Sequence, residues 1–347
     1  MRTSVNRFLL SSLKILMLFL SPIPLSLLKF VPDERWRIYL YAWTSISLLF
    51  VLVMSSVVAR SKLVAAGLIL LYPMIACATV ASIFPRYFSA EINSIFFDRV
   101  IPPNYIHILG TDFTGRDILH SVILGGGNTY HMAFYSTCVA TILGVLAGVL
   151  LVSNNHIVKI VANSLVEVFE IFPWLFLLIL VVGVLNMRSQ QSVFFLSEET
   201  RTAAVALAIG LSCIPVIARL LQRLIESLCE KEFVKTLLAS GVSRTKVFVY
   251  NIIWKNVFPD LLMQVSFLFG LTVIIDSSLD FMMEIGFGDY GKGGYISWGT
   301  LLADARQSAI FGKDLWIVLV PGIGVVFTIL GTNLIGEGLA LEHKVRD

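Results

Sequence analysis

Runs of predominantly apolar residues, each about as long as a membrane crossing, recur along this chain and restrict its fold more than any other feature. An α-helix rises about 1.5 Å per residue, so about 20 residues cross the hydrocarbon core of a bilayer. Only 14% of the 347 residues are charged, against about a quarter in a soluble domain. The runs lie at 8–28, 39–59, 63–85, 132–152, 171–187, 202–219, 257–280 and 315–337. We therefore expect an all-α polytopic membrane protein with eight crossings, or with six if the N-terminal pair is peripheral.

Net charge and the cysteine and histidine patterns exclude several functional classes. A net charge of +3, with no block of Lys and Arg interleaved with aromatic residues, offers no surface for nucleic acid. The four cysteines form no CxxC pair, and the five histidines form no HxxxH or HExxH pattern. We therefore expect a lipid bilayer around the chain, no nucleic-acid partner and no metal site.

The basic residues near the ends of the runs predict the orientation of the chain. Cytoplasmic loops of membrane proteins carry an excess of Lys and Arg, and the segment from Arg219 to Asn256 holds seven of them. Basic residues also crowd the turn at Arg60 and Lys62 and precede the first run. If these places are cytoplasmic, alternation puts 86–131, 188–201 and 281–314 outside and both termini inside.

The cytoplasmic segment 220–256 has an unusual pattern for a connector. It is amphipathic at helical spacing, breaks at Gly241 and continues as a second amphipathic stretch. A glycine that adopts a positive φ commonly ends a helix. The segment is therefore either a short helix that sits in a groove of another protein or a solvated connector between two crossings. Upstream, residues 157–170 show helical spacing and either extend the next crossing or lie at the membrane interface.

Residues 232–243 and 251–253 resemble the EAA loop of bacterial ABC importer permeases. In that family a short helix and a following glycine dock onto the ATPase subunit. At the positions of the Glu-Ala-Ala signature this chain has Lys235, Thr236 and Leu237, which is a departure from the family pattern. The resemblance implies that this loop contacts the ATPase through Glu232, Lys235, Ala239, Ser240, Gly241 and Asn251.

Further stretches resemble motifs of one subfamily, the dipeptide/oligopeptide/nickel permeases, and within it the second of two permease subunits. Its HPxGTDxxGRD, ESSLSFLG…PSWGxxLADAR and NLLGDGLRD motifs are matched in order. The matching residues are 107–117, 276–281, 297–299, 302–306 and 333–339. The resemblance implies a permease domain over 63–347 and leaves 1–62 as extra N-terminal transmembrane helices.

This resemblance implies a transmembrane permease subunit of an ATP-binding cassette importer in the bacterial inner membrane. Its implied cargo is a peptide or a similar small polar solute, with nickel or another solute as the alternative. The implied partners are a homologous permease, two ATPase subunits and an extracytoplasmic solute-binding protein. ATP and Mg²⁺ would be bound by the ATPases, and this chain would be non-catalytic. An ion-coupled secondary transporter and a non-transporting membrane scaffold remain the alternatives from other classes.

A charged motif lies just outside the expected crossing at 132–152. Its glycines permit tight turns, so an Asp–Arg network could close the external end of the pathway. The other interpretation is a structural turn that caps a helix starting near Arg116, with Asp112 or Thr114 as the cap. The residues concerned are Gly110, Thr111, Asp112, Gly115, Arg116 and Asp117.

Acidic residues near the outer end of the 257–280 run are candidates for the pathway, because bare charge in lipid is costly. Asp276 and Asp280 are one helical turn apart and share a face. They could meet a substrate amine or reach interfacial water, and Ser277 and Trp298 join them as pathway candidates.

The glycine-rich segment 286–293 fits GxGxxG and nearly fits a P-loop. A P-loop needs Ser or Thr after its Lys to hold Mg²⁺, and a strand before the loop. Here Gly293 follows Lys292, and the preceding run is an apolar helix. We therefore expect an external turn, with the ATPase on another polypeptide.

Overall fold

The structure is a computed structural model in which all of the described regular elements are helical. It describes residues 61–83, 100–105, 107–112, 115–153, 155–171, 178, 198–243, 246–283, 296–306 and 314–346. The predicted runs at 8–28 and 39–59, most of 171–187 and the glycine-rich segment 286–293 lie outside these residues. Within them, the expectation of an all-α fold is confirmed.

The helices are long, and several have the length and composition of a membrane crossing. They are α3 Lys62–Ile83, α5 Ile118–Leu151, α6 His156–Ile171, α8 Glu198–Ser212, α9 Ile214–Cys229, α10 Glu232–Ala239, the π-helix η2 Val247–Val257, α12 Phe258–Met283, α13 Trp298–Asp304 and α15 Trp316–Arg346. Among the described residues, five stretches could span a bilayer: Lys62–Thr79, Ile118–Leu151, Thr202–Cys229, Val247–Met282 and Trp316–Glu342. The chain is therefore an integral membrane protein by its architecture.

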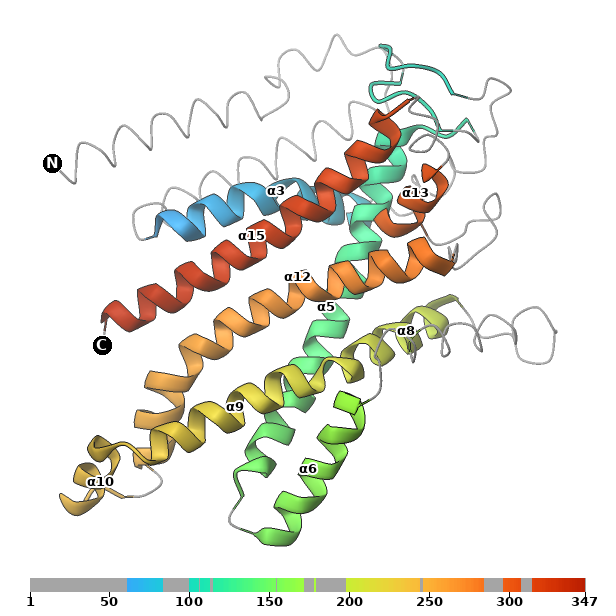
Figure 1. The fold of residues 1–347 in the computed structure, drawn as a ribbon. Helices are drawn as coiled ribbons and strands as arrows, with labels where there is room; N and C mark the ends of the chain where they lie inside the picture. Colours follow the sequence, from blue (N-terminus) through green and yellow to red (C-terminus); the bar gives the residue numbers. More distant parts are fainter. Residues whose placement is uncertain are drawn as a thin grey trace, which may run out of the picture.

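The helix α5 is the centre of the bundle. In Figure 1 it crosses behind α3, α15, α12 and the α8–α9 pair, which follow one another as a layer, and it packs against all of them. Two glycines one turn apart allow α9 to approach closely. A Cβ at Gly144 would lie 2.6 Å from Cβ of Ile217, and one at Gly148 would lie 2.8 Å from Cβ of Leu221. Such a small-residue face is a common contact between helices in membranes.

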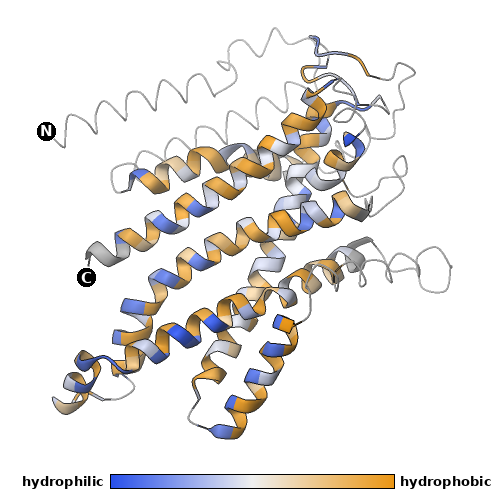
Figure 2. Cartoon of the chain, viewed as in Figure 1, coloured by the Kyte–Doolittle hydropathy of each residue, from blue (hydrophilic) through white to orange (hydrophobic). Residues whose placement is uncertain are grey.

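The two ends of the bundle carry different parts of the chain. Residues 100–117 and α13 lie together at one end, where α5 begins, and α10 lies at the other, at the lower left of the view (Figure 1). Figure 2 shows the long helices as mainly hydrophobic between the ends, with hydrophilic residues gathered on α9, α10 and η2 toward the α10 end. We call these the α13 end and the α10 end.

Two predicted boundaries differ from the structure. The crossing expected at 132–152 belongs to a helix that already begins at Ile118, because Asp117 caps it there. The run expected at 202–219 likewise continues as helix to Cys229, so part of the expected cytoplasmic segment 220–256 is helical, and its position relative to the membrane stays a prediction. Both differences have one cause: polar residues and glycines lower the hydropathy of a helix without ending it.

Candidate functional site

Arg116 joins two of the sequence motifs at the α13 end. Its Nε donates to Oδ2 of Asp112 at 2.8 Å, and its Nη2 donates to Oδ2 of Asp304 at 3.1 Å. Asp304 is the last residue of α13 and lies 188 positions further along the chain. Both Asp112 and Arg116 are 7% exposed. An Asp–Arg network is thus present, and it links the loop before α5 to α13; its role in closing the pathway stays a prediction.

The loop that presents Arg116 is a tight turn. Gly110 and Gly115 have φ of 75° and 80°, a region that residues with a side chain rarely adopt. A Cβ at Gly110 would also lie 2.5 Å from the carbonyl oxygen of Ile101. Thr111 is fully buried, and its Oγ1 accepts from the Ile101 amide at 2.7 Å. The backbone geometry therefore requires these motif residues whether or not the turn is also a gate.

Asp117, rather than Asp112 or Thr114, caps the N-terminus of α5. Its Oδ1 accepts from the amide of His120 at 3.1 Å, which makes Asp117 the N-cap of α5. Its Oδ2 lies 2.9 Å from Nδ1 of His107. The prediction of Asp112 or Thr114 as the cap is therefore wrong, because the helix begins after Arg116 and Asp112 is occupied by the Arg116 side chain.

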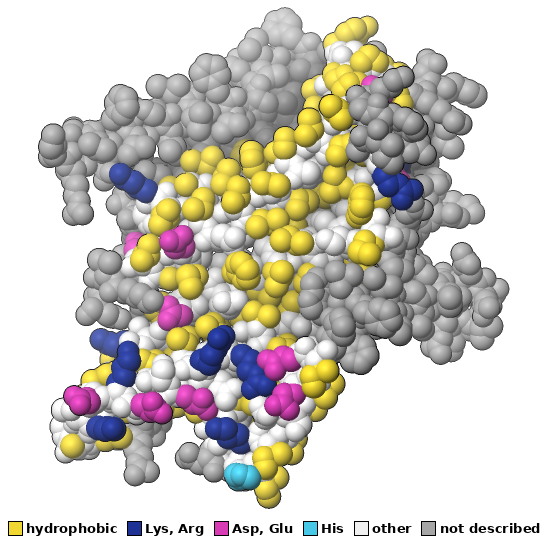
Figure 3. All heavy atoms as spheres, viewed as in Figure 1, with side chains coloured by type: hydrophobic (Ala, Val, Ile, Leu, Met, Phe, Trp, Pro, Cys, Tyr) yellow, Lys and Arg dark blue, Asp and Glu magenta, His cyan; other side chains and the backbone are white. Residues whose placement is uncertain are grey.

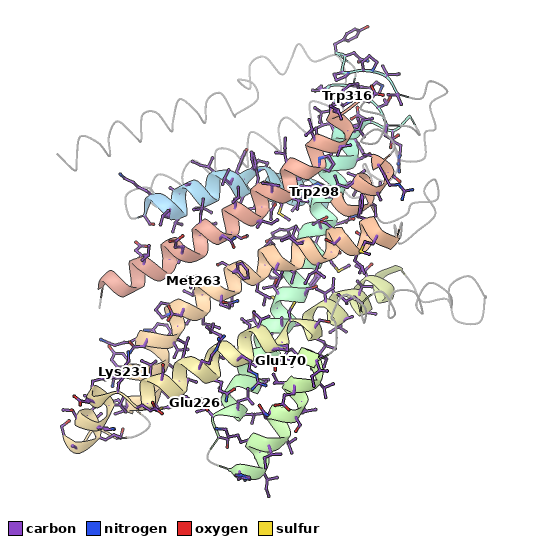
Figure 4. The ribbon with its side chains drawn as sticks, viewed as in Figure 1. Glu170, Glu226, Lys231, Met263, Trp298 and Trp316 are labelled. Carbon is purple, nitrogen blue, oxygen red and sulfur yellow. The ribbon has the colours of Figure 1, made fainter. Side chains whose placement is uncertain are left out.

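The short helix α13 is anchored to the bundle by its first two residues. Ser297 caps it, in a capping box with Thr300, and also donates to Oδ2 of Asp280 on α12. Trp298 is 2% exposed, and its Nε1 donates to the carbonyl of Val122 at 3.0 Å. Its ring lies 2.9 Å from the position of a Cβ on Gly126 and on Gly324. Figure 4 shows Trp298 between α13 and the longer helices.

The residues proposed for the pathway are all covered at the α13 end. Asp276 and Asp280 are 1% exposed, and Ser277 is 7% exposed. Gly299 of α13 lies so close to α12 that a Cβ there would be 2.6 Å from the Ser277 carbonyl and 2.7 Å from Cβ of Asp280. Oδ2 of Asp276 and Oγ of Ser277 have no hydrogen-bond partner among the described residues. Their role in solute passage stays a prediction.

The α10 end presents its motif residues in the opposite way. Glu232, Lys235 and Ala239, like Ser240 and Gly241, are exposed, and Val234 is the residue of α10 that is buried. Asn251 lies apart from them, half-buried in η2. The structure therefore brings five of the six predicted coupling residues to one exposed tip and places the sixth on the adjoining helix.

Gly241 ends α10 in a Schellman motif. Its φ is 84°, the Val242 amide donates to the Leu237 carbonyl at 3.2 Å, and the Gly241 amide donates to the Leu238 carbonyl at 3.1 Å. Nothing lies within 4 Å of a Cβ at this position. Gly241 is thus required by the backbone conformation and leaves open space around it.

Two features at the α10 end were not predicted. One is the π-helix η2, a rare conformation that is frequent at functional sites. Its exposed aromatic residues are Tyr250 and Trp254, and the Trp254 ring stacks on Phe258 at 4.9 Å. The other is a polar network between α6 and α9 that is described below. The spacing of the apolar residues does not predict a π-helix, because i→i+5 hydrogen bonds change this spacing only over a short stretch.

The chain is similar in sequence to transport permeases over most of its length. The dipeptide transport system permease protein DppC of Alkalihalophilus pseudofirmus is 26% identical over 289 residues, which is 83% of this chain and 88% of that protein. The oligopeptide transport system permease protein OppC of Haemophilus influenzae is 28% identical over 297 residues, 83% of this chain and 86% of that protein. The peptide transport system permease protein SapC of Escherichia coli is 26% identical over 248 residues, with 70% and 76% covered.

No family model matches the chain. The similarity to curated relatives nevertheless extends over most of both sequences, and each of these relatives is a permease protein of a peptide transport system. The resemblance inferred from the motifs is therefore confirmed.

Proposed function

We propose that this chain is the translocation-pathway subunit of an ATP-binding cassette importer for peptides or similar small polar solutes. The observation that carries the proposal is its similarity to peptide transport permeases over most of its length. The structure supports it, because the motif residues that are far apart in sequence meet in space, as Arg116 and Asp304 do.

The exposed tip at the α10 end is suited to contact with the ATPase subunits. Glu232 and Lys235 offer charge of both signs, and Phe233 and Leu238 add apolar surface, with exposed fractions of 38% and 39%. Mixed polar and apolar surface is typical of protein interfaces. ATP and Mg²⁺ would be held by the partners, and this chain would perform no covalent chemistry.

The helix α12 gives the proposed subunit a direct mechanical path between its two ends. With η2 it runs without a break from Val247, next to the exposed tip, to Met283. Asp280, near its far end, accepts a hydrogen bond from Ser297 of α13. Closure of the ATPases would displace α10, and the displacement would reach α13 along one continuous helix. Packing of whole helices against each other, rather than local deformation, would then alternate the pathway between its outward and inward states.

The remaining partners and the orientation follow from the same proposal. The α10 end carries Lys231, Lys235 and Lys246 and would face the cytoplasm, together with both termini. The α13 end would face a solute-binding protein outside the inner membrane. A homologous permease would complete the pathway across the bundle.

The test is reconstitution of the full importer, encoded with its neighbouring permease and ATPase genes, in liposomes. We expect ATP-dependent peptide uptake that Gly241→Pro abolishes, because proline cannot adopt the positive φ of this position. Gly322→Ala is the matched control, since its Cβ would meet nothing closer than 3.9 Å. An importer that takes up solute on an ion gradient without ATP, or a chain that recovers no ATPase on purification, would contradict the proposal.

A further inference from the structure

A row of polar side chains joins α6 to α9 on the side of the bundle next to the α10 end. The residues are spaced three or four apart on each helix, so each set lies on one face. They come from two helices that run in opposite directions and pack against each other. The members of this row, which we call the α6–α9 ladder, are Lys159, Asn163, Glu167 and Glu170 on α6 and Arg219, Gln222 and Glu226 on α9.

Arg219 is the centre of the ladder. Its Nε and Nη2 donate to the two carboxylate oxygens of Glu170 at 2.8 and 2.9 Å, in a bidentate pair. Its Nη1 donates to Oδ1 of Asn163 at 2.8 Å and to Oε1 of Gln222 at 3.1 Å. Because the guanidinium is planar and hydrogen-bonded to both helices, it restricts the orientation of Arg219 and of the side chains that it contacts. The hydrogen bond from Arg219 also lowers the pKa of Glu170.

The ladder continues toward α10. Gln222 donates to Oε1 of Glu226 at 3.3 Å, and Lys159 donates to the same oxygen at 3.2 Å. The polar contacts therefore run without interruption from Arg219 to Glu226. Figure 4 shows Glu170 and Glu226 on facing sides of the two helices, with Lys231 beyond them at the start of α10.

Besides the ladder, α6 packs against α5 and α9 through a small apolar contact. The side chains that α6 buries are Ala162 and Val166, which join Leu151 and Ala218 in a small cluster. Most of its large apolar side chains are exposed, with Ile157 at 73% and Ile171 at 79%. The ladder thus adds directional polar contacts between α6 and α9 to this apolar packing.

The Glu226 end of the ladder lies close to the end of α9, next to the exposed tip. α9 ends at Cys229 and α10 begins at Glu232, so a displacement of α10 acts at once on the end of α9. Figure 3 shows basic and acidic side chains gathered over this lower part of the molecule, below a band that is mostly hydrophobic. Partly exposed charges are costly in lipid, so this face contacts water or another polar surface.

We propose that Arg219 and Glu170, assisted by Lys159 and Glu226, are positioning residues that clamp α6 to α9, so that both helices move with α10 and solute transport stays coupled to ATP hydrolysis. The inference rests on the proposed function. It adds a second mechanical path, through α9 and α6, to the one through α12.

The experiment is charge reversal in the reconstituted importer, with solute transported per ATP hydrolysed as the readout. Arg219→Glu and Glu170→Arg, each alone, place like charges together and are expected to lower this ratio about three- to tenfold, which lies within the range of coupling between contacting residues. The double variant restores the pair with its sign reversed and is expected to recover most of the ratio. Recovery is the result that a merely structural role of either residue would not produce.

Two further variants keep the test sharp. Arg223→Glu is the matched control, because Arg223 lies one turn along α9 and is exposed, and its Nε donates to the Arg219 carbonyl rather than to a residue of α6. It makes the same charge change and is expected to leave the ratio unaltered. Arg219→Lys keeps the charge but loses the bidentate fork, so it is expected to give an intermediate ratio even if the reversals reduce the amount of folded protein.

The outcomes separate the clamp from the proposed function. If the unmodified importer shows no ATP-dependent uptake, the proposed function fails. If the unmodified importer transports normally and Arg219→Glu leaves the ratio of transport to hydrolysis unchanged, the clamp is overturned while the function stands. The same conclusion holds if the loss of this ratio in the double variant equals the product of the losses in the two single variants.

Discussion

The two ends of this bundle use their motif residues in opposite ways. At the α13 end, Arg116 and Trp298 are buried against other parts of the same chain. At the α10 end, Glu232 and Lys235 point away from it. We interpret a motif whose side chains are buried in contacts within the chain as stabilising the fold of the subunit. We interpret a motif whose side chains are exposed as available for binding a partner. The comparison predicts that substitutions at the α13 end reduce stability and that those at the α10 end reduce coupling.

The largest effect is expected from Arg116→Ala. The substitution leaves the buried carboxylate of Asp112 without its cation, and breaking a buried pair costs about 3–5 kcal/mol. Thermal unfolding of the purified chain in detergent measures the loss. Lys235→Ala is the control at the other end, and a similar loss there would remove the distinction between the two ends.

A smaller effect is expected from Ser297→Ala. It removes the N-cap of α13 and the donor to Asp280, and loss of a cap costs about 0.5–2 kcal/mol. The midpoint of unfolding should fall accordingly. Ser297→Thr keeps a capping oxygen and should retain most of the stability; equal losses for both variants would show that crowding rather than hydrogen bonding is responsible.

Gly241→Ala tests the α10 end through its backbone. A left-handed conformation costs a non-glycine residue about 1–2 kcal/mol, but the position is open and lies at an exposed tip. The strain should appear in the shape of the tip, so we expect weaker recovery of the ATPase subunits on affinity purification and little change in the unfolding midpoint. A large fall in the midpoint with normal ATPase recovery would place Gly241 with the structural motifs.

The smallest change in stability is expected from Lys235→Glu. Exposed substitutions away from special features usually stay within about 0.5 kcal/mol, so unfolding should be unaffected. Peptide-stimulated ATP hydrolysis of the assembled importer should nevertheless fall if this side chain contacts the ATPase. Unchanged hydrolysis would indicate that the apolar residues of α10, rather than Lys235, make the main contact with the ATPase.

The sequence predicts the all-α fold class well, because it depends on long apolar runs, and the number of crossings stays a prediction. It predicts helix ends less well. Gly125, Asn128 and His131 lower the hydropathy of the first part of α5, so the apolar run at 132–152 marks only part of this helix. Arg219 and Arg223 do the same in α9, so the apolar run at 202–219 stops before the helix does.

The sequence indicates which residues form the motifs but not which contacts they make. The Asp112–Arg116 pair is local and could be expected, whereas the contact of Arg116 with Asp304 depends on how α13 returns to α5. The α6–α9 ladder is visible in hindsight as polar residues at helical spacing on both helices. Only the packing of α6 on α9 shows that the two rows meet.

The π-helix η2 can tolerate a one-residue deletion that the long α-helices cannot. Each residue advances an α-helix by about 100° around its axis, so a one-residue deletion within α12 would turn the face of Asp276 and Asp280 away from α13. A π-helix has more residues per turn than an α-helix, because its hydrogen bonds join residues five apart. A one-residue deletion within η2 can therefore convert a π-helical turn to an α-helical turn without rotating α12. The segment between α10 and α12 is therefore where changes in chain length can accumulate among related sequences without disturbing the α13 end.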